Sequence, residues 1–224
     1  SWQNTSMSKT VTRSPAFDAA LHVIKGAVCT VLRIPTGRTT DRVSPHEGGG
    51  KLTLNAIKDE PTEEQKELIV TNVHNKVEEN APFKVFTGVP RDLAEKKYFD
   101  TMYDSFKVPD SVKELRLVYL EQWNLNCNVH PIVKSTGLLG DINLTKWKYS
   151  AKKSTLEISF TVDPPCDVFE MAEEDSNVED LPPLDIAVPY VPDEQLSQDG
   201  VLGVSEGQKV TPWEVEGSDE GIDY

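Results

Sequence analysis

The apolar residues near the start of the chain recur at helical spacing. They lie three or four positions apart, so on a helix they form one stripe that faces a core. The stripe consists of Phe17, Leu21, Ile24, Val28 and Leu32. We therefore expect a core helix over residues 16–32.

Two further segments carry the signature of helices. After Pro61, Thr62 is followed three residues later by Gln65, which is the spacing of a capping box at a helix start. The apolar residues of this helix that face one way are Ile69, Val73 and Val77. A short helix is expected over residues 91–98.

Between and after these helices, apolar and polar residues alternate, as they do in strands with one buried face. The alternating segments are 51–56, 83–89, 115–123, one that begins at Ile142, and 156–162. The last is the clearest and should pair with the strand from Ile142. This mixed order of elements predicts an α+β domain over residues 14–162.

The composition changes abruptly after residue 162. Residues 163–224 hold 18 acidic residues and the single Lys209, a net charge of −17, whereas residues 1–162 carry +3. An acidic segment with few apolar residues does not bury enough surface to offset its ordering entropy. We expect a mostly unstructured tail, with an acidic linker over 163–209, and a disordered N-terminus over 1–13. The slightly basic body is compatible with an RNA partner.

The three cysteines, an odd number at irregular spacing, argue against a secreted disulfide framework and for a reducing compartment. The sequence shows neither an apolar run of the ~18 residues that a membrane span requires nor a signal peptide. We expect a cytoplasmic protein, with neither a membrane nor DNA as a partner.

Candidate metal ligands occur in two places. Asp18 and His22 lie four apart, so they share one face of the first predicted helix, and Cys127 and His130 lie in the polar stretch 123–137. A tetrahedral zinc site built from these four residues is one possibility. The alternative is that His22 is an ordinary, hydrogen-bonded core residue.

A second cluster joins basic and aromatic side chains. Lys146, Lys148, Lys152 and Lys153 are interleaved with Trp147 and Tyr149. Such a cluster can grip phosphates and stack on unpaired bases of RNA, here tRNA. The alternative is a hairpin whose lysines face water while its aromatic residues face the core.

Several segments resemble the AlaX family, the free-standing relatives of the editing domain of alanyl-tRNA synthetase. They are AALHVIKGAV (19–28), KLTL (51–54), PTEEQKELI (61–69), MYDSFKVPDSVKELRLVYLEQWN (102–124) and KSTGLLGDI (134–142). The resemblance implies a mixed, largely antiparallel sheet with packed helices. It also implies a metal site made by a His-x-x-x-His pair on the helix and a Cys-x-x-x-His pair in the later stretch.

The sequence departs from that metal-binding pattern. His22 takes the place of the second helical His, but Asp18 replaces the first. Alignment without gaps puts Asn128 and Ile132 at the places of the later Cys and His, which leaves Cys127 and His130 out of register. The resemblance therefore implies an inactive editing fold with no catalytic residue and no cofactor, and the zinc site of Asp18, His22, Cys127 and His130 stays as the alternative.

The last 15 residues resemble a different family. VTPWEVEGSDEGIDY (210–224) is similar to the segment just upstream of the catalytic domain in eukaryotic-type tryptophanyl-tRNA synthetases. The two resemblances imply an AlaX-like domain appended to such a synthetase, as in some protists, and a non-catalytic aid to tRNA binding. ATP, Mg²⁺ and any homodimer contact would then belong to the downstream catalytic domain. The alternative function is a metal-dependent deacylase that hydrolyses mischarged tRNA.

Overall fold

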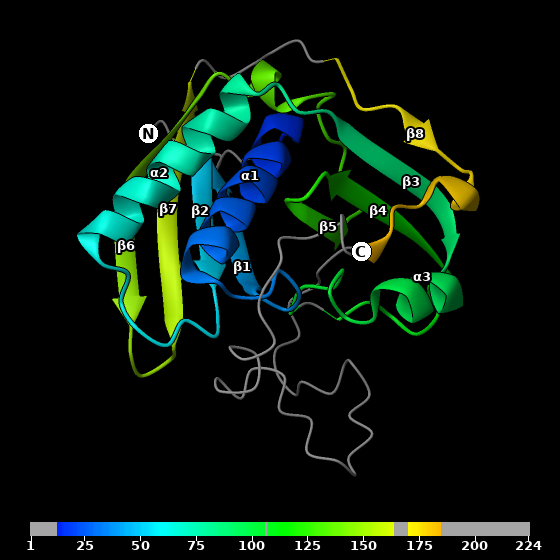
Figure 1. Ribbon diagram of the computed structural model, residues 1–224, viewed down its shortest axis with the longest axis horizontal. Coiled ribbons are helices and arrows are strands. Elements are labelled where there is room, and N and C mark those ends of the chain that lie inside the picture. Colours follow the sequence, from blue (N-terminus) through cyan, green and yellow to red (C-terminus); the bar gives the residue numbers. More distant parts are fainter. Residues whose placement is uncertain (1–12, 106, 164–169, 185–224) are drawn as a thin grey trace, which may run out of the picture.

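Two four-stranded sheets lie on either side of a long helix in the computed structural model, which describes residues 13–105, 107–163 and 170–184 (Figure 1). The predicted regions 1–12 and 210–224 lie outside these residues, as does most of the predicted linker. The described part is an α+β structure, as the order of sequence patterns predicts.

The first sheet is antiparallel throughout and has the strand order β1-β2-β7-β6. Its strands are β1 (Thr40–His46), β2 (Gly49–Leu54), β7 (Thr155–Asp163) and β6 (Asp141–Ser150). Ile142 pairs with Val162, which confirms the predicted pairing of the last two strands. The β2 strand begins two residues before the expected segment 51–56 and ends at Leu54, because Ala56 adopts a positive φ of 58° that a strand does not accommodate.

The second sheet has the order β5-β4-β3-β8. Its strands are β5 (Asn124–Cys127), β4 (Glu114–Leu120), β3 (Phe83–Pro90) and β8 (Glu174–Asp175). The single strand predicted over 115–123 is wrong at its end, because Gln122 adopts a left-handed φ of 51° and the chain turns back there. The stretch expected to follow a strand as a loop therefore begins with a strand of its own, β5.

The helices are α1 (Pro15–Leu32), α2 (Glu63–Glu78) and α3 (Arg91–Tyr98), with short 3₁₀ turns at η1 (Thr136–Leu139) and η2 (Val178–Asp180). Ser14 caps α1 through its hydroxyl, and the predicted capping box of Thr62 and Gln65 begins α2. All three predicted helices are confirmed, and the two with predicted bounds agree within one residue.

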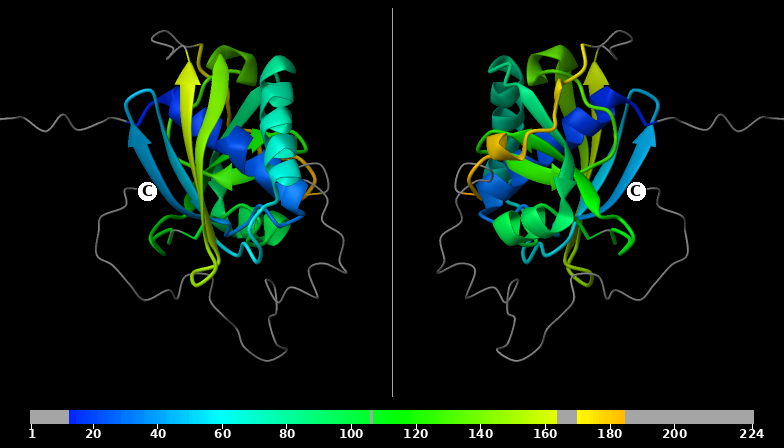
Figure 2. Two further views of the ribbon diagram at one scale, coloured as in Figure 1. Left: turned by 90° about the vertical axis from the view of Figure 1, so that its left-hand side faces the viewer. Right: turned by 90° about the vertical axis from the view of Figure 1, so that its right-hand side faces the viewer.

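The helix α1 lies between the two sheets and beside α2 (Figures 1 and 2). Its length and composition would allow it to cross a membrane, but 78% of it is buried inside the protein, as in a core helix. Its apolar side packs with α2 and the inner face of the first sheet in one core. A second core is formed by α3 and the second sheet around Tyr98, Met102 and Leu117.

Part of the predicted linker is folded. Residues 170–184, which we call the strap, cross the edge of the second sheet, where β8 pairs in parallel with β3 (Figure 1). Leu181 is 4% exposed in the second core, and the Tyr98 hydroxyl donates a 2.6 Å hydrogen bond to the Pro182 carbonyl. The described body therefore continues beyond Val162, because a few apolar residues of the acidic segment find a place in that core.

Candidate functional site

One face of α1 is polar although it is buried. Asp18, His22, Lys25 and Cys29 follow one another at spacings of four, three and four, so their side chains form a stripe along the helix. They are between 0% and 5% exposed. Burial of polar groups costs free energy unless they are paired. We therefore expect the fold to provide a hydrogen-bond or ion-pair partner for each residue of the stripe.

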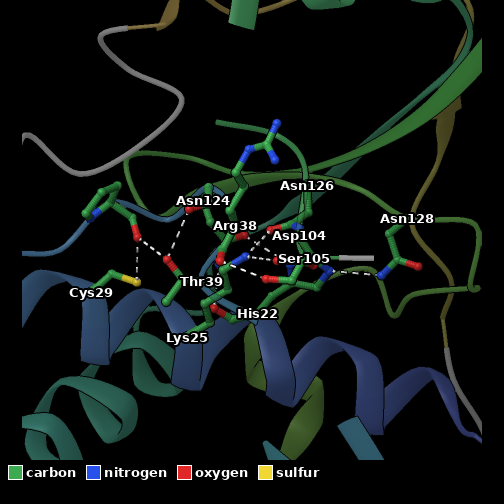
Figure 3. Close-up of polar contacts among 12 residues, drawn as sticks. His22, Lys25, Cys29, Arg38, Thr39, Asp104, Ser105, Asn124, Asn126 and Asn128 are labelled. Carbon is green, nitrogen blue, oxygen red and sulfur yellow. Dashed lines mark hydrogen bonds and ion pairs between the residues drawn. The ribbon is translucent and has the colours of Figure 1, made fainter. Parts of the chain in front are cut away.

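The strand β5 supplies the facing polar groups. Asn124 and Asn126 lie two apart and Asn128 follows directly after the strand, while Leu125 and Cys127 pack on the second core. Alternation along a strand sends successive side chains to opposite faces. The three asparagines therefore lie along the polar stripe of α1, and we call this interface the polar seam (Figure 3).

Both ring nitrogens of His22 are held by amides. The Asn124 side-chain amine donates to the His22 carbonyl at 2.7 Å, which leaves its Oδ1 to accept from His22 Nδ1 at 3.0 Å. The Asn128 Oδ1 accepts from the His130 backbone N–H at 2.8 Å, so its amine faces His22 Nε2 at 3.3 Å. These roles fix the neutral tautomer with the proton on Nδ1.

The surroundings of His22 oppose its protonation. Burial lowers its pKa from 6.5 to about 4, against the opposing effect of Asp18, and the charge of Lys25 lowers it further. A proton on Nε2 would also face the donor amine of Asn128. His22 is therefore neutral at pH 7, and its remaining lone pair is directed at an amide.

Lys25 forms a buried ion pair next to His22. Its ammonium lies 2.5 Å from Asp104 and 3.1 Å from the Asn126 Oδ1, and the Asn126 amine donates to the other Asp104 oxygen at 2.7 Å. The three groups thus satisfy one another in a closed triangle (Figure 3). Asp104 comes from the segment between α3 and β4. The triangle therefore ties α1 to two parts of what we call the second half, which consists of the second sheet, α3 and the segments between them.

Cys29, at the C-terminal end of the stripe, has a thiol of low reactivity. The thiol of Cys29 and the hydroxyl of Thr39 both donate to the Pro35 carbonyl. Burial raises the pKa of Cys29 to about 12, so the reactive thiolate is scarce at neutral pH. Cys29 is a structural residue.

The four predicted metal ligands have separate partners. Asp18 accepts hydrogen bonds from Arg13, Cys127 packs against the second core, and His130 is engaged through its backbone. His130 lies near Arg13, whose positive charge adds to burial in lowering its pKa. No three His, Cys, Asp or Glu side chains come together as a metal site within residues 13–105, 107–163 and 170–184.

The predicted RNA-binding lysines lie on and beside β6. Lys146, Lys148, Lys152 and Lys153 are exposed, whereas Trp147 and Tyr149 pack against the first core. The Tyr149 hydroxyl also donates to the Lys58 carbonyl at 2.6 Å. The aromatic rings therefore face away from the lysines, as in the hairpin alternative, and only the lysines are placed to contact phosphates.

Sequence reasoning missed Lys25, Asp104, Asn124 and Asn126, and it missed the contact of Asn128 with His22. A signal was present, because the run Asn-Leu-Asn-Cys-Asn alternates polar and apolar residues with the period of a strand. For Lys25 the signal was its place on the same helical face as Asp18 and His22. Each signal gains its meaning only from the contact between α1 and β5, which are distant in the sequence.

The seam is arranged to hold its groups in place. In the described part of the chain, the His22 ring meets amides in place of a hydroxyl, a thiol or a carboxylate, so it cannot act as a general base unless Asn128 moves away. No protein-family model matches the sequence. The chemistry of the seam and of the surface lysines is therefore what bears on function.

Proposed function

We propose that this chain is an AlaX-like module appended to a tryptophanyl-tRNA synthetase, and that it assists tRNA binding without catalysing a reaction. The proposal rests on the two sequence resemblances, on the polar seam and on the exposed lysines of the β6–β7 hairpin. It assigns no cofactor to the chain itself.

The contact between Asn128 and His22 carries the non-catalytic part of the proposal. The ungapped alignment puts Asn128 at the place of the family's metal-binding Cys, and its side chain lies 3.3 Å from Nε2 of His22, the only ligand of the pattern that is retained. An amide donor thus occupies the side of the ring that a metal would need. Ile132, at the place of the family's last His, is 1% exposed in the first core.

The metal question is tested by elemental analysis of the purified chain. We expect no zinc to be retained after dialysis, because a single His with Asp18 leaves the four-ligand shell incomplete. One tightly held zinc per chain that is lost in His22→Ala, together with chelator-sensitive hydrolysis of seryl- or glycyl-tRNA(Ala), would establish the deacylase instead.

The tRNA-binding part is tested by removing the four lysines. Lys146, Lys148, Lys152 and Lys153 are exposed, so their joint replacement by Ala should leave the folded state nearly unchanged. Binding of tRNA should weaken, and the log-log salt slope should flatten by up to about one unit for each lost phosphate contact.

The matched control is Lys84→Ala with Lys96→Ala. Both residues are exposed cations of the second half, on β3 and α3. This variant should bind tRNA as the parent does. Equal binding by the parent, the control and the four-lysine variant would refute the tRNA-binding role of the hairpin.

A further inference from the structure

The outer face of the first sheet presents two aligned rows of polar side chains. The strand pairing places one residue of each strand in a row, because directly paired residues point to the same face. The first row is Arg42, Thr53, Glu157 and Lys148, and the second is Ser44, Lys51, Ser159 and Lys146. We call these eight residues the outer face.

All eight residues of the outer face are exposed or half-buried. The neighbouring positions on the same strands point inward, where Leu52 and Ile158 are buried and Val43 packs against them in the first core. Figure 2 (left) shows the strands of this sheet in front of α1, which covers the opposite side. The lysines and Arg42 are at least partly exposed, and Lys51 is 42% exposed.

The charge of the outer face is predominantly positive. The eight residues include four cations and one carboxylate, Glu157, which lies 3.6 Å from Lys51. Asp141 and Asp163 pair beyond the two rows, at the end of the sheet away from the hairpin tip. Lys152 and Lys153 extend the positive charge to the tip of the hairpin. The cations lie on β1, β2 and β6, so they cover more of the sheet than the edge strand that carries Lys146 and Lys148.

Two cations outside the first sheet form ion pairs with the acidic strap. Arg116 contacts Glu174 at 3.2 Å, and Lys134 contacts Glu170 at 3.2 Å. Lys97 donates to the Leu181 carbonyl. The strap thus lowers the positive charge of the second half, and a polyanion would be drawn to the outer face.

The side-chain types of the outer face indicate which form of RNA it fits. The eight residues include no aromatic ring, because Trp147 and Tyr149 are turned to the core. A surface without aromatic rings, on which only the Arg42 guanidinium could stack, offers little of the stacking on which affinity for single strands depends. Lysine and arginine with the hydroxyls of Ser44, Thr53 and Ser159 instead suit phosphates and 2′-hydroxyls, the groups that a double-helical RNA presents.

We infer that the outer face binds the backbone of a double-helical RNA stem, independently of its base sequence. This inference rests on the proposed tRNA-binding function and deepens it, since it adds Arg42 and Lys51 and names the class of RNA structure that is held. The stem would lie across the four strands of the first sheet, with the hairpin tip at one end.

The test uses the whole chain with a generic RNA duplex and a single strand of equal length and mixed sequence. The duplex should bind more tightly. In Arg42→Ala/Lys51→Ala, duplex binding should weaken and the log-log salt slope should fall by about two units, because each phosphate contact contributes about 0.9. The Lys84→Ala/Lys96→Ala variant should bind as the parent does.

A gain of affinity provides the sharper test. Glu157→Gln removes the one carboxylate of the outer face, so duplex binding should strengthen by up to about fivefold, roughly the effect of one charge pair at contact distance in water. Improved binding cannot result from damage to the fold. Circular dichroism and thermal melting would show that all the variants are folded.

Three outcomes would overturn the inference. Single-stranded RNA that binds as tightly as the duplex would exclude a duplex-specific surface. Parent-like duplex binding by Arg42→Ala/Lys51→Ala, with a defect in the four-lysine variant, would confine binding to the hairpin and leave the proposed function intact. If neither variant differs from the parent with either tRNA or duplex, the proposed function fails as well.

Discussion

A neutral histidine inside a protein needs a hydrogen-bond acceptor at one ring nitrogen and a donor at the other. Asn124 and Asn128 provide this pair for His22, and each amide is itself oriented by a backbone group. The ring is therefore fixed in position, tautomer and charge. A residue with the spacing of a metal ligand is here a buried structural residue in a network of amides.

This network makes stability depend on pH. The pKa of His22 is about 4 in the folded chain, against an ordinary value of 6.5 when the chain is unfolded, so the unfolded chain binds more protons between these values. The contribution is fully present above pH 6.5 and is lost as the pH falls to 4, which amounts to about 3 kcal/mol. Urea unfolding of His22→Gln should show a lower stability at pH 7 and a shallower decline from pH 6.5 to 4.

The control for this prediction is His46→Gln, which removes an exposed histidine at the end of β1. It should follow the parent's decline with pH. If His22→Gln declines as steeply as the parent, the acid sensitivity arises elsewhere.

The ion pair of Lys25 and Asp104 should show strong coupling. Asp104→Ala leaves a buried ammonium with only Asn126 as its partner, so it should cost about 3 kcal/mol or more in free energy of unfolding. Lys25→Met/Asp104→Ala removes both charges and should cost less than the sum of Lys25→Met and Asp104→Ala measured singly. A double-mutant cycle in urea measures the coupling, and additive losses would contradict it.

Elements with strong local signals could be predicted from the sequence. The capping box at Thr62 and the apolar stripe of α1 locate two helices, and the alternation over 156–162 locates a strand with its partner. The strand β5 escaped prediction because the turn at Gln122 interrupts an otherwise continuous run. The asparagines of β5 act as hydrogen-bond partners only because α1 packs opposite them in the folded chain.

The strap escaped prediction for a related reason. Its strand has only two residues, and its composition is that of a solvated acidic segment. What fixes it is tertiary contact, mainly Leu181 in a core made by residues that are distant in sequence. Composition describes a segment's own tendency, and a neighbouring core can override it.

Leu181→Ala tests whether the strap is anchored. A buried leucine truncated to Ala typically costs 2–5 kcal/mol, so we expect a loss of about 2 kcal/mol or more in urea unfolding, with faster amide exchange over residues 170–184. The control is Met171→Ala, in the same segment but 41% exposed, which should change stability little. Equal, small effects of both changes would show that the strap is not held by the core.

At the scale of the whole molecule, charge is divided between two regions. The first 162 residues carry +3 and the rest carry −17, and the described part of the acidic region is bound to the second half. The ion pairs of the described strap therefore involve cations outside the first sheet. This distribution of charge supports the proposal that RNA binds the first sheet.

The proposed role predicts the effect of deletion in the full-length synthetase. Removal of residues 1–184 should raise the KM for tRNA and leave tryptophan activation by ATP nearly unchanged, the kinetic sign of lost uniform binding. The deletion ends at residue 184 because a deletion that ended at residue 162 would leave Leu181 in the protein without the core that buries it. Aminoacylation and pyrophosphate exchange measure the two steps, and loss of activation or an unchanged KM for tRNA would contradict the role.

The position of the strap also has a mechanical consequence. A pulling force applied beyond residue 184 reaches the strap before it reaches β7. The strap is held by a two-residue parallel ladder, one buried leucine, and a few hydrogen bonds and surface ion pairs. The strap should therefore detach at a lower force than the body, while the long β6–β7 pair stays intact. In a single-molecule pulling experiment we expect a small first step that releases the roughly 15 residues of the strap, about 50 Å of chain, ahead of the unfolding of the body.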